Sequence, residues 1–254
     1  EIAFYAFNCV LLKSEFIEKN AFSVKRTFIF IQKFPFFFRV FYYQFYDDLE
    51  WGPMHWFHAT SKDLIHWKKL GRITDSRHDD RDVVIFPETV NGKFVKLSRA
   101  MDKCGEGYKN PNPAMWISFS NDLMEWPREE ELFYMGQEDW EDAKVGASCP
   151  PIKTEKGWLL IYHGVSSKDK AYRVGAMMLD LDDPRKILAK TKQFIMEPEF
   201  AFETGGFYNG CVFPTGIVEK DGKFFIYYGA GDQCICVATI DRNEMINELM
   251  GGKA

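Results

Sequence analysis

The sequence lacks the cysteine and histidine patterns of a metal site. It has six cysteines but no C-x-x-C pair, and no His/Cys/Asp spacing typical of zinc ligands. Cys234 and Cys236, two residues apart, are expected to share one face of a strand rather than to hold a metal. The scattered, mostly apolar cysteine settings predict reduced thiols and a cytoplasmic location.

The chain has no excess of positive charge and no long uninterrupted apolar run. A net charge of -5 argues against general nucleic-acid binding, although it allows a local basic pocket. The most apolar stretch, residues 28–46, is interrupted by Gln32, Lys33, Pro35 and Arg39, which argues against a membrane span. No small-residue cleavage site follows it, so it does not predict a signal peptide. We expect aromatic β-strand here, and we place the boundary between an irregular lead-in, residues 1–36, and a β-domain, residues 37–254, inside this stretch.

Helical patterns are also scarce. Glycine, proline and asparagine punctuate short strands, and only Arg242–Met250 carries an apolar stripe at helical spacing. Hydrophobic residues make up 46% and aromatic residues 17% of the chain, which is ample for a packed core. The sequence therefore predicts an all-β protein with one short C-terminal helix.

An internal repeat dominates the chain. Its clearest copy runs from Lys144 to Gly164, where two prolines precede a strand, a glycine turn and a second strand. Similar copies surround Phe86-Pro87 with the turn Asn91-Gly92, and Phe213-Pro214 with the turn Asp221-Gly222. The prolines at 87, 151 and 214 are 64 and 63 residues apart. A period of this length indicates a repeat architecture.

A second pattern marks the outer part of each unit. Residues 59–67 and 118–126 share a strand end, an S-x-D-L turn and a tryptophan. Four-stranded units repeated in this way fit a β-propeller better than a sandwich. From Phe86 we count three full units with a partial one before them, so the N-terminal blade is expected to be incomplete or completed by the aromatic stretch.

Four basic residues occupy equivalent places in these repeats. Arg81 and Lys144 precede the first two proline motifs, and Arg99 and His163 end the strands that follow them. If these ends converge on a propeller axis, the four side chains form a site for an oxyanion such as phosphate. Solvated or salt-bridged surface charges are the commoner interpretation of such residues when no other information is used.

Several stretches resemble glycoside hydrolase family 130 in order along residues 70–250. They are R-D-V-V-I-F-P-E (81–88), G-K-F-V-K-L-S-R (92–99), K-V-G-A-S-C-P-P-I-K-T-E-K-G-W-L-L-I-Y-H-G-V (144–165), Y-R-V-G-A-M-M-L-D-L-D-D-P (172–184), Y-N-G-C-V-F-P-T-G (208–216) and Y-Y-G-A-G-D (227–232). Within that family they look most like mannosylglucose phosphorylases. The resemblance implies a five-bladed β-propeller that acts on β-mannosides.

The resemblance also assigns site residues. The family's phosphate ligands fall on Arg81, Arg99, Lys144 and His163, and its sugar site falls on Asp232, Tyr208 and Asn209. From the residues alone, a role for Asp232 as a turn residue after glycines is as well supported as a role in sugar binding. The resemblance implies inorganic phosphate as co-substrate, a small carbohydrate as substrate, no cofactor and no metal. A homo-oligomer is compatible with it.

The chain departs from this family at the catalytic acid. The family's E-D-P-R-like motif does not occur before Arg81, and Asp182-Asp183-Pro184-Arg185 belongs to a later turn. The family's H-R-P reads Ser98-Arg99-Ala100 here, and its G-A-G reads Gly146-Ala147-Ser148. The catalytic residue stays unassigned, and Asp47, Asp48 and Glu50 are the carboxylates to test first.

Residues 37–67 resemble a different family, the β-fructosidases of glycoside hydrolase family 32, but the W-M-N-D-P-N-G motif of that family is absent. Trp51, His55, Trp56 and His58 in this stretch fit core packing better than a sugar cavity.

Three functions follow as alternatives. The first is inverting phosphorolysis of β-mannosides to α-mannose 1-phosphate, weakened by the missing acid. The second is a non-catalytic propeller that binds sugar or phosphate, and the third is a β-fructosidase.

Overall fold

A computed structural model describes residues 29–34, 37–45 and 53–251 of the chain, and these form four antiparallel sheets. The first sheet contains β1 (Ile29–Phe34), β2 (Phe37–Phe45), β3 (Met54–Ser61) and β4 (Trp67–Arg72). The second contains β5 (Asp80–Ile85), β6 (Phe94–Ala100), β7 (Met115–Ser120) and β8 (Glu131–Tyr134). The third contains β9 (Lys144–Ala147), β10 (Ile152–Thr154), β11 (Gly157–Val165), β12 (Tyr172–Leu179) and β13 (Ile187–Lys190). The fourth contains β14 (Val212–Lys220), β15 (Lys223–Ala230) and β16 (Cys234–Asp241).

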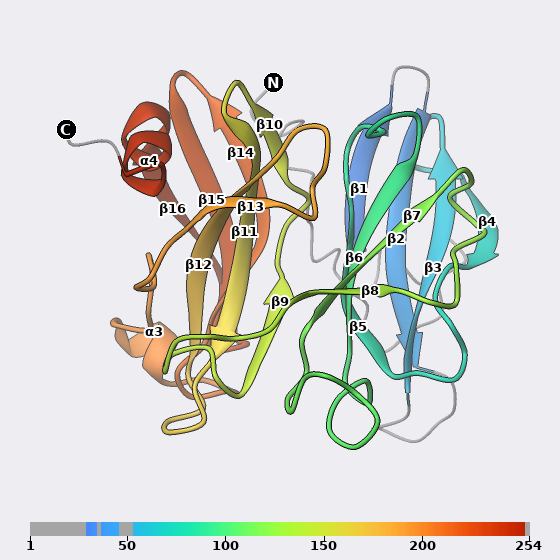
Figure 1. The fold of residues 1–254 in the computed structure, drawn as a ribbon. Helices are drawn as coiled ribbons and strands as arrows, with labels where there is room; N and C mark the ends of the chain where they lie inside the picture. The colour runs from blue at the N-terminus through green and yellow to red at the C-terminus, as the bar shows by residue number, and fades with distance from the viewer. Residues whose placement is uncertain (1–28, 35–36, 46–52, 252–254) are drawn as a thin grey trace.

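The sheets follow one another as the blades of a propeller. Strand order within each sheet follows chain order, and β3 contacts β5, β6 contacts β9, and β12 contacts β14. Figure 1 shows the first two sheets on one side of the molecule and the last two on the other, with β9 between them. The predicted all-β propeller fold is therefore confirmed, and the described residues supply four blades of the five-bladed ring.

The proline repeat lies within or just after the first strand of three consecutive sheets. Pro87 follows β5, Pro151 lies between β9 and β10, and Pro214 lies within β14 beside a β-bulge. The hairpin turns Asn91-Gly92 and Asp221-Gly222 have positive φ at both residues, as type I′ turns require.

The two S-x-D-L turns are built alike on the outer edges of the first two sheets. Ser61 Oγ accepts a hydrogen bond from Asp63 N (3.2 Å), and Ser120 Oγ accepts one from Asp122 N (3.0 Å). In the first turn the Trp67 indole donates to the Leu64 carbonyl (3.2 Å). The Trp126 indole donates to the Leu123 carbonyl (2.8 Å) in the second. The repeated letters thus encode a repeated local structure.

The core lies between the sheets, in two clusters of buried apolar side chains. One is formed mainly by the first three sheets, and the other by the third and fourth sheets with the C-terminal helix α4 (Arg242–Leu249). Every residue of β11 is buried, because this central strand is covered on both faces. Asp241 caps α4 by accepting from the backbone amides of Asn243 and Glu244, so the helix predicted over 242–250 is confirmed.

Three details differ from expectation. β1 lies within the predicted lead-in of residues 1–36, so residues 29–34 belong to the first sheet instead. That sheet has four strands, and the incomplete blade is the last one, where no fourth strand pairs with β16 among the described residues. The short helix α3 (Ala201–Thr204) was not predicted, because four residues are too few to show a helical period.

Cys234 and Cys236 lie on one face of β16 with their Sγ atoms 4.0 Å apart, as predicted. The five cysteines in the described residues are free thiols. No helix in the described part of the chain is long and apolar enough to cross a membrane.

Replacing Leu160 with alanine tests the central role of β11. Leu160 is fully buried in the larger core cluster, so Leu160→Ala should lower the free energy of unfolding by about 2–5 kcal/mol in urea titrations. Leu188→Ala on β13 is the control, because Leu188 is 47% exposed and should cost less than about 1 kcal/mol. Equal losses in both variants would contradict this packing.

Candidate active site

The strand pair β5–β6 places two of the predicted phosphate ligands opposite each other. Arg81 and Arg99 are register partners, and the register then shifts between Arg81 and Val84. Asp82 lies in this irregularity with φ of +52°, a conformation that non-glycine residues adopt rarely. The distorted backbone brings the Asp82 carboxylate to the Arg99 guanidinium.

Asp82 is the centre of the site. Arg99 donates to Asp82 Oδ2 from Nε at 2.5 Å and also from Nη2, and His163 Nε2 lies 3.3 Å from the same oxygen. Arg99 is 3% exposed and His163 is fully buried. Because Asp82 and Arg99 belong to the second sheet and His163 to β11 of the third, this cluster joins two blades.

The close approach of the two blades requires a glycine at position 146. Gly146 is the register partner of His163 on β9. A Cβ atom at this position would lie 2.4 Å from Asp82 Oδ2 and 2.7 Å from His163 Cε1. The first residue of the Gly146-Ala147-Ser148 motif thus leaves room for the ionic cluster.

Charge and burial determine the protonation states. Burial raises the pKa of Asp82, but Arg99 and His163 outweigh it and hold that pKa well below its usual range. Burial lowers the pKa of His163, although Asp82 opposes this effect. Asp82 is therefore ionised and an acceptor only, and His163 lies beside it as a neutral imidazole, with Nε2 3.3 Å from Oδ2.

Ser148 holds the His163 ring from its other side. Its Oγ lies at hydrogen-bond distance, 3.0 Å, from His163 Nδ1. The His163 ring also packs against Phe213 of β14 at 4.6 Å between centroids. The phenylalanine of the third proline repeat thus brings the fourth sheet to the same cluster.

Lys144 reaches the cluster through Tyr172. Its Nζ donates to the Tyr172 hydroxyl at 2.6 Å and lies 4.8 Å from the centre of that ring, which packs against His163. Burial, reinforced by Arg99 and Arg81, lowers the pKa of Lys144 from the ordinary 10.5 to about 8. Part of the Lys144 population is therefore neutral at mildly alkaline pH.

Arg81 completes the predicted set at the edge of the cluster. Its side chain is 29% exposed and forms an ion pair with Asp79, with Nη2 2.7 Å from Oδ2. Arg99, His163 and Lys144 thus lie close together around Asp82 and Tyr172, and Arg81 lies beside them on the paired strand. Their assignment to phosphate stays a prediction.

Of the three predicted sugar-binding residues, Tyr208 contacts this region, and Asp232 and Asn209 are exposed. The Tyr208 ring makes an edge contact with Tyr172, 5.3 Å between centroids. Asp232 is an exposed turn residue with φ of +52°, and its Oδ1 lies 4.0 Å from Cys211 Sγ. Asn209 is exposed on the loop between Tyr208 and β14. Within the described residues, Tyr208 thus reaches the basic residues only through its contact with Tyr172.

Three contributors to the site were not predicted. Asp82 stands next to Arg81 in the quoted R-D motif, Tyr172 opens the quoted Y-R-V-G-A motif, and Ser148 replaces a glycine of the family pattern. Each letter was visible in the sequence, but only the backbone irregularity at Asp82 and the sheet pairing show that they meet.

The remaining candidates lie elsewhere. His55, Trp56 and His58 are buried and belong to the interior of the first sheet, as the core-packing interpretation predicted. Asp183 lies on the surface, where it pairs with Arg185, so it is not placed as an acid of this site. Trp51, Asp47, Asp48 and Glu50 lie outside the described residues.

The arrangement suits the binding of a tetrahedral oxyanion. Arg99 offers a planar fork, Lys144 a point charge and His163 a directed N–H, which together match phosphate. In the structure Asp82 accepts from Arg99 and lies beside His163, so an arriving anion competes with an internal carboxylate.

Comparison with known proteins identifies the family of the chain. The family model for glycoside hydrolase family 130, described as beta-1,4-mannooligosaccharide phosphorylase, matches residues 46–250. The chain belongs to glycoside hydrolase family 130. The predicted recognition is therefore confirmed, and the match begins earlier than the stretches that suggested it.

Relatives in family 130 are β-mannoside phosphorylases. The chain is 39% identical over 187 residues to a 1,2-beta-oligomannan phosphorylase of Thermoanaerobacter sp., covering 74% of this chain and 58% of that protein. It is 31% identical over 188 residues to a 4-O-beta-D-mannosyl-D-glucose phosphorylase of Bacteroides fragilis, covering 71% and 47%. The structure of the Listeria innocua beta-1,2-mannobiose phosphorylase, in complex with beta-1,2-mannobiose, superposes with a TM-score of 0.75 at 29% identity. That superposition covers 87% of this chain and 59% of that one. The chain thus spans less than two thirds of the length of these relatives.

The similarity to β-fructosidases is confined to one short segment. A fructan beta-fructosidase of Streptococcus mutans is 75% identical over 28 residues, which is 11% of this chain and 2% of that protein. A match of this length covers about one hairpin, so it does not change the family assignment.

Phosphate should raise the pKa of Lys144, because a neighbouring anion favours the charged ammonium. We expect NMR titration of the lysine side chains, assigned with Lys144→Arg, to show a pKa near 8 without phosphate. Saturating phosphate should shift this value upward. A Lys144 signal that is unaffected by phosphate would contradict the predicted site.

Proposed function

We propose that this chain carries the phosphate-binding and part of the sugar-binding machinery of an inverting β-mannoside phosphorylase. The observation that carries the proposal is the convergence of Arg99, His163 and Lys144 around Asp82 at the junction of two blades. Membership of family 130, with phosphorylases among the relatives, supports phosphate rather than another oxyanion.

In the proposed reaction, phosphate attacks the anomeric carbon of a β-mannoside and the leaving sugar departs from the opposite face. The product is α-mannose 1-phosphate. Arg99 and His163 would orient the phosphate and Lys144 would neutralise its charge, so that the anion can approach the sugar. Arg81, at the more exposed edge, would exchange its ion pair with Asp79 for the same anion.

Asp82 regulates entry of the anion in this scheme. Its carboxylate neutralises the buried Arg99 when phosphate is absent, which avoids the large cost of an unpaired buried charge. Phosphate brings more negative charge and more acceptor oxygens, so it can displace the carboxylate from the shared donors.

The proposed reaction also needs an acid that protonates the leaving sugar, and the site does not identify that acid. Among the described residues, the carboxylates that contact the four basic side chains are Asp79 and Asp82. Asp82 is held ionised and cannot donate a proton at neutral pH. No E-D-P-R-like motif precedes Arg81 in the sequence, so this chain offers no assigned acid.

The second candidate function is binding without turnover. It is favoured by the absence of an assigned acid among the described residues. The β-fructosidase alternative rests on residues 37–67 alone.

The first experiment measures phosphate affinity by calorimetry. Lys144→Ala should weaken phosphate binding about tenfold or more, because one charge-assisted interaction is lost. Lys153→Ala is the matched control, since Lys153 is exposed and pairs with Glu88 outside the site. Unchanged phosphate affinity in Lys144→Ala would remove this lysine from the anion site.

The second experiment measures turnover. We expect the chain by itself to release α-mannose 1-phosphate from β-mannobiose and phosphate at well below about 1 per second, because a positioned acid contributes about 10²–10⁴-fold. Turnover within the usual enzyme range would show that a carboxylate outside the described residues supplies the proton. Asp47, Asp48 and Glu50 would then be replaced one at a time.

A further inference from the structure

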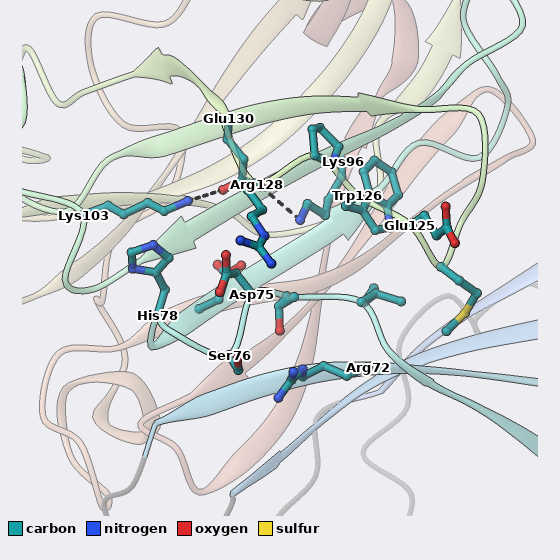
Figure 2. Close-up of a pocket in the computed structure, with 15 residues that line it drawn as sticks. Arg72, Asp75, Ser76, His78, Lys96, Lys103, Glu125, Trp126, Arg128 and Glu130 are labelled. Carbon is teal, nitrogen blue, oxygen red and sulfur yellow. Dashed lines mark hydrogen bonds and ion pairs between the residues drawn. The ribbon is translucent and has the colours of Figure 1, made fainter.

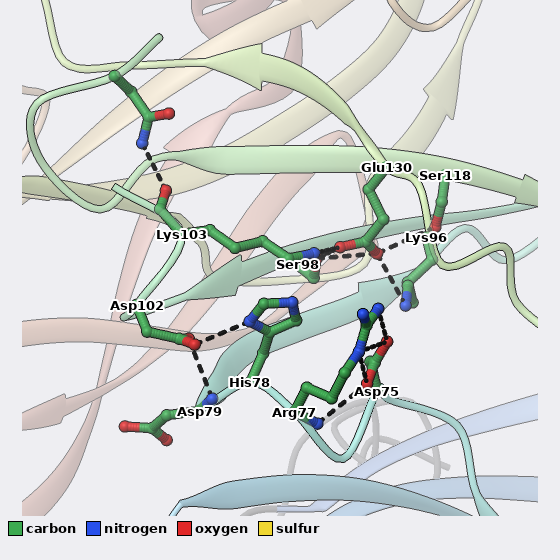
Figure 3. A network of polar contacts seen from close by, with 11 residues as sticks. Asp75, Arg77, His78, Asp79, Lys96, Ser98, Asp102, Lys103, Ser118 and Glu130 are labelled. Atoms are coloured by element: carbon green, nitrogen blue, oxygen red, sulfur yellow. Dashed lines mark hydrogen bonds and ion pairs between the residues drawn. The ribbon is translucent and has the colours of Figure 1, made fainter. Parts of the chain in front are cut away.

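A second cluster of buried charges lies on the opposite face of β6 from the phosphate site. Lys96 and Ser98 alternate along the strand with Leu97 and Arg99, so they face the first sheet instead of the third. Glu130 is the hub of this cluster (Figure 3). It accepts from Lys96 Nζ at 3.0 Å and from Lys103 Nζ at 2.5 Å.

The hub is fully occupied by these internal contacts. The Ser98 and Ser118 hydroxyls also donate to Glu130, at 3.3 Å and 3.4 Å. The side chains of Lys96, Lys103 and Glu130 are all less than 10% exposed. Both ammonium groups are therefore already neutralised and held in place.

Asp80 is different, because it is buried beside Glu130 and one of its carboxyl oxygens makes no hydrogen bond within the described part of the chain. Asp80 is 3% exposed, and its Oδ1 has no hydrogen-bond partner among the described residues. Burial and the nearby Glu130 raise the pKa of Asp80 to about 7, although Lys96 and Lys103 oppose them. A buried carboxyl oxygen without a partner is costly, so a group that donates a hydrogen bond to Asp80 would lower this cost.

Asp80 lines a cavity of about 660 Å³ between the first two sheets. Figure 2 shows Lys96, Lys103 and Glu130 along one side of it, with Arg72 opposite and Arg128 projecting between them. The volume is in the range of small-molecule sites.

The cavity wall carries charges of both signs and little net charge. Arg72, Lys96, Lys103 and Arg128 face the carboxyl groups of Asp75, Asp80, Glu125 and Glu130. A dianion would find its two innermost cations already bound to Glu130. A neutral molecule with many hydroxyl groups can instead donate to carboxylates and accept from guanidinium groups without disturbing this balance.

Trp126 supplies the apolar part of such a site. It is half-buried in the cavity wall, and its indole nitrogen donates to the Leu123 carbonyl at 2.8 Å, which fixes the ring. A fixed aromatic surface beside dense polar groups offers contacts to both the C–H and the O–H groups of a sugar.

We propose that the cavity between the first and second sheets binds a neutral carbohydrate, with Asp80 as its buried hydrogen-bond acceptor and Trp126 as its apolar wall. This site is separate from the phosphate cluster and does not depend on the proposed phosphorolysis.

The test is a fluorescence titration of the full chain with beta-1,2-mannobiose in the absence of phosphate. Mannobiose should change the tryptophan emission, and Trp126→Phe should abolish most of that change. Trp67→Phe is the matched control, because Trp67 occupies the same position in the equivalent turn of the first sheet but does not line the cavity. Asp80→Leu, with similar volume and no acceptor, should weaken mannobiose binding about tenfold or more.

Thermal unfolding of each variant checks that it is folded. If Asp80→Leu does not fold, the comparison of Trp126→Phe with Trp67→Phe still shows whether mannobiose binds in this cavity. The proposal is wrong if mannobiose gives no change in the parent, or if Trp126→Phe retains the full change. It is equally wrong if inorganic phosphate, and not mannobiose, causes the Trp126-dependent change. Mannose 1-phosphate production is measured separately, so the failure of one proposal leaves the other intact.

Discussion

The carboxylate of Asp82 is the interaction on which the site depends. It holds Arg99 of the second sheet and His163 of the third, and both partners are buried where an unpaired charge would be strongly destabilising. The positive φ of Asp82 and the absence of a side chain at Gly146 both serve this contact. In the structure this internal carboxylate neutralises the buried Arg99 guanidinium.

Periodic features were predicted well from the sequence. The proline repeat recurred within or just after the first strands of three consecutive sheets, and Asn91-Gly92 and Asp221-Gly222 formed the expected turns, because local residue preferences decide these features. The structure brings Arg99, His163 and Lys144 close together, and their role in phosphate binding stays a prediction. The role of Asp82 could not be predicted, because it depends on a strand irregularity and on contact between two sheets.

The contacts among the charged residues between the first two sheets could not be predicted from the sequence either. Lys96 and Ser98 are polar residues in an otherwise apolar strand, which is a visible anomaly. Their partner Glu130 follows about thirty residues later in a loop before β8, and no sequence spacing predicts that they meet. The strand β6 thus carries ionic clusters on both faces, one toward each neighbouring blade, and this explains why charged residues are tolerated within the core of the propeller.

The account predicts that the buried cations require an anion and that Asp82 and phosphate compete for them. The most direct test is the thermal stability of Asp82→Asn against the parent protein, with phosphate and with chloride at equal ionic strength. Without phosphate the variant should unfold at a lower temperature, because Arg99 has lost its counter-charge. Phosphate should then stabilise the variant more than it stabilises the parent, since binding to the folded state raises stability by mass action. A smaller response to phosphate in Asp82→Asn than in the parent would contradict the competition.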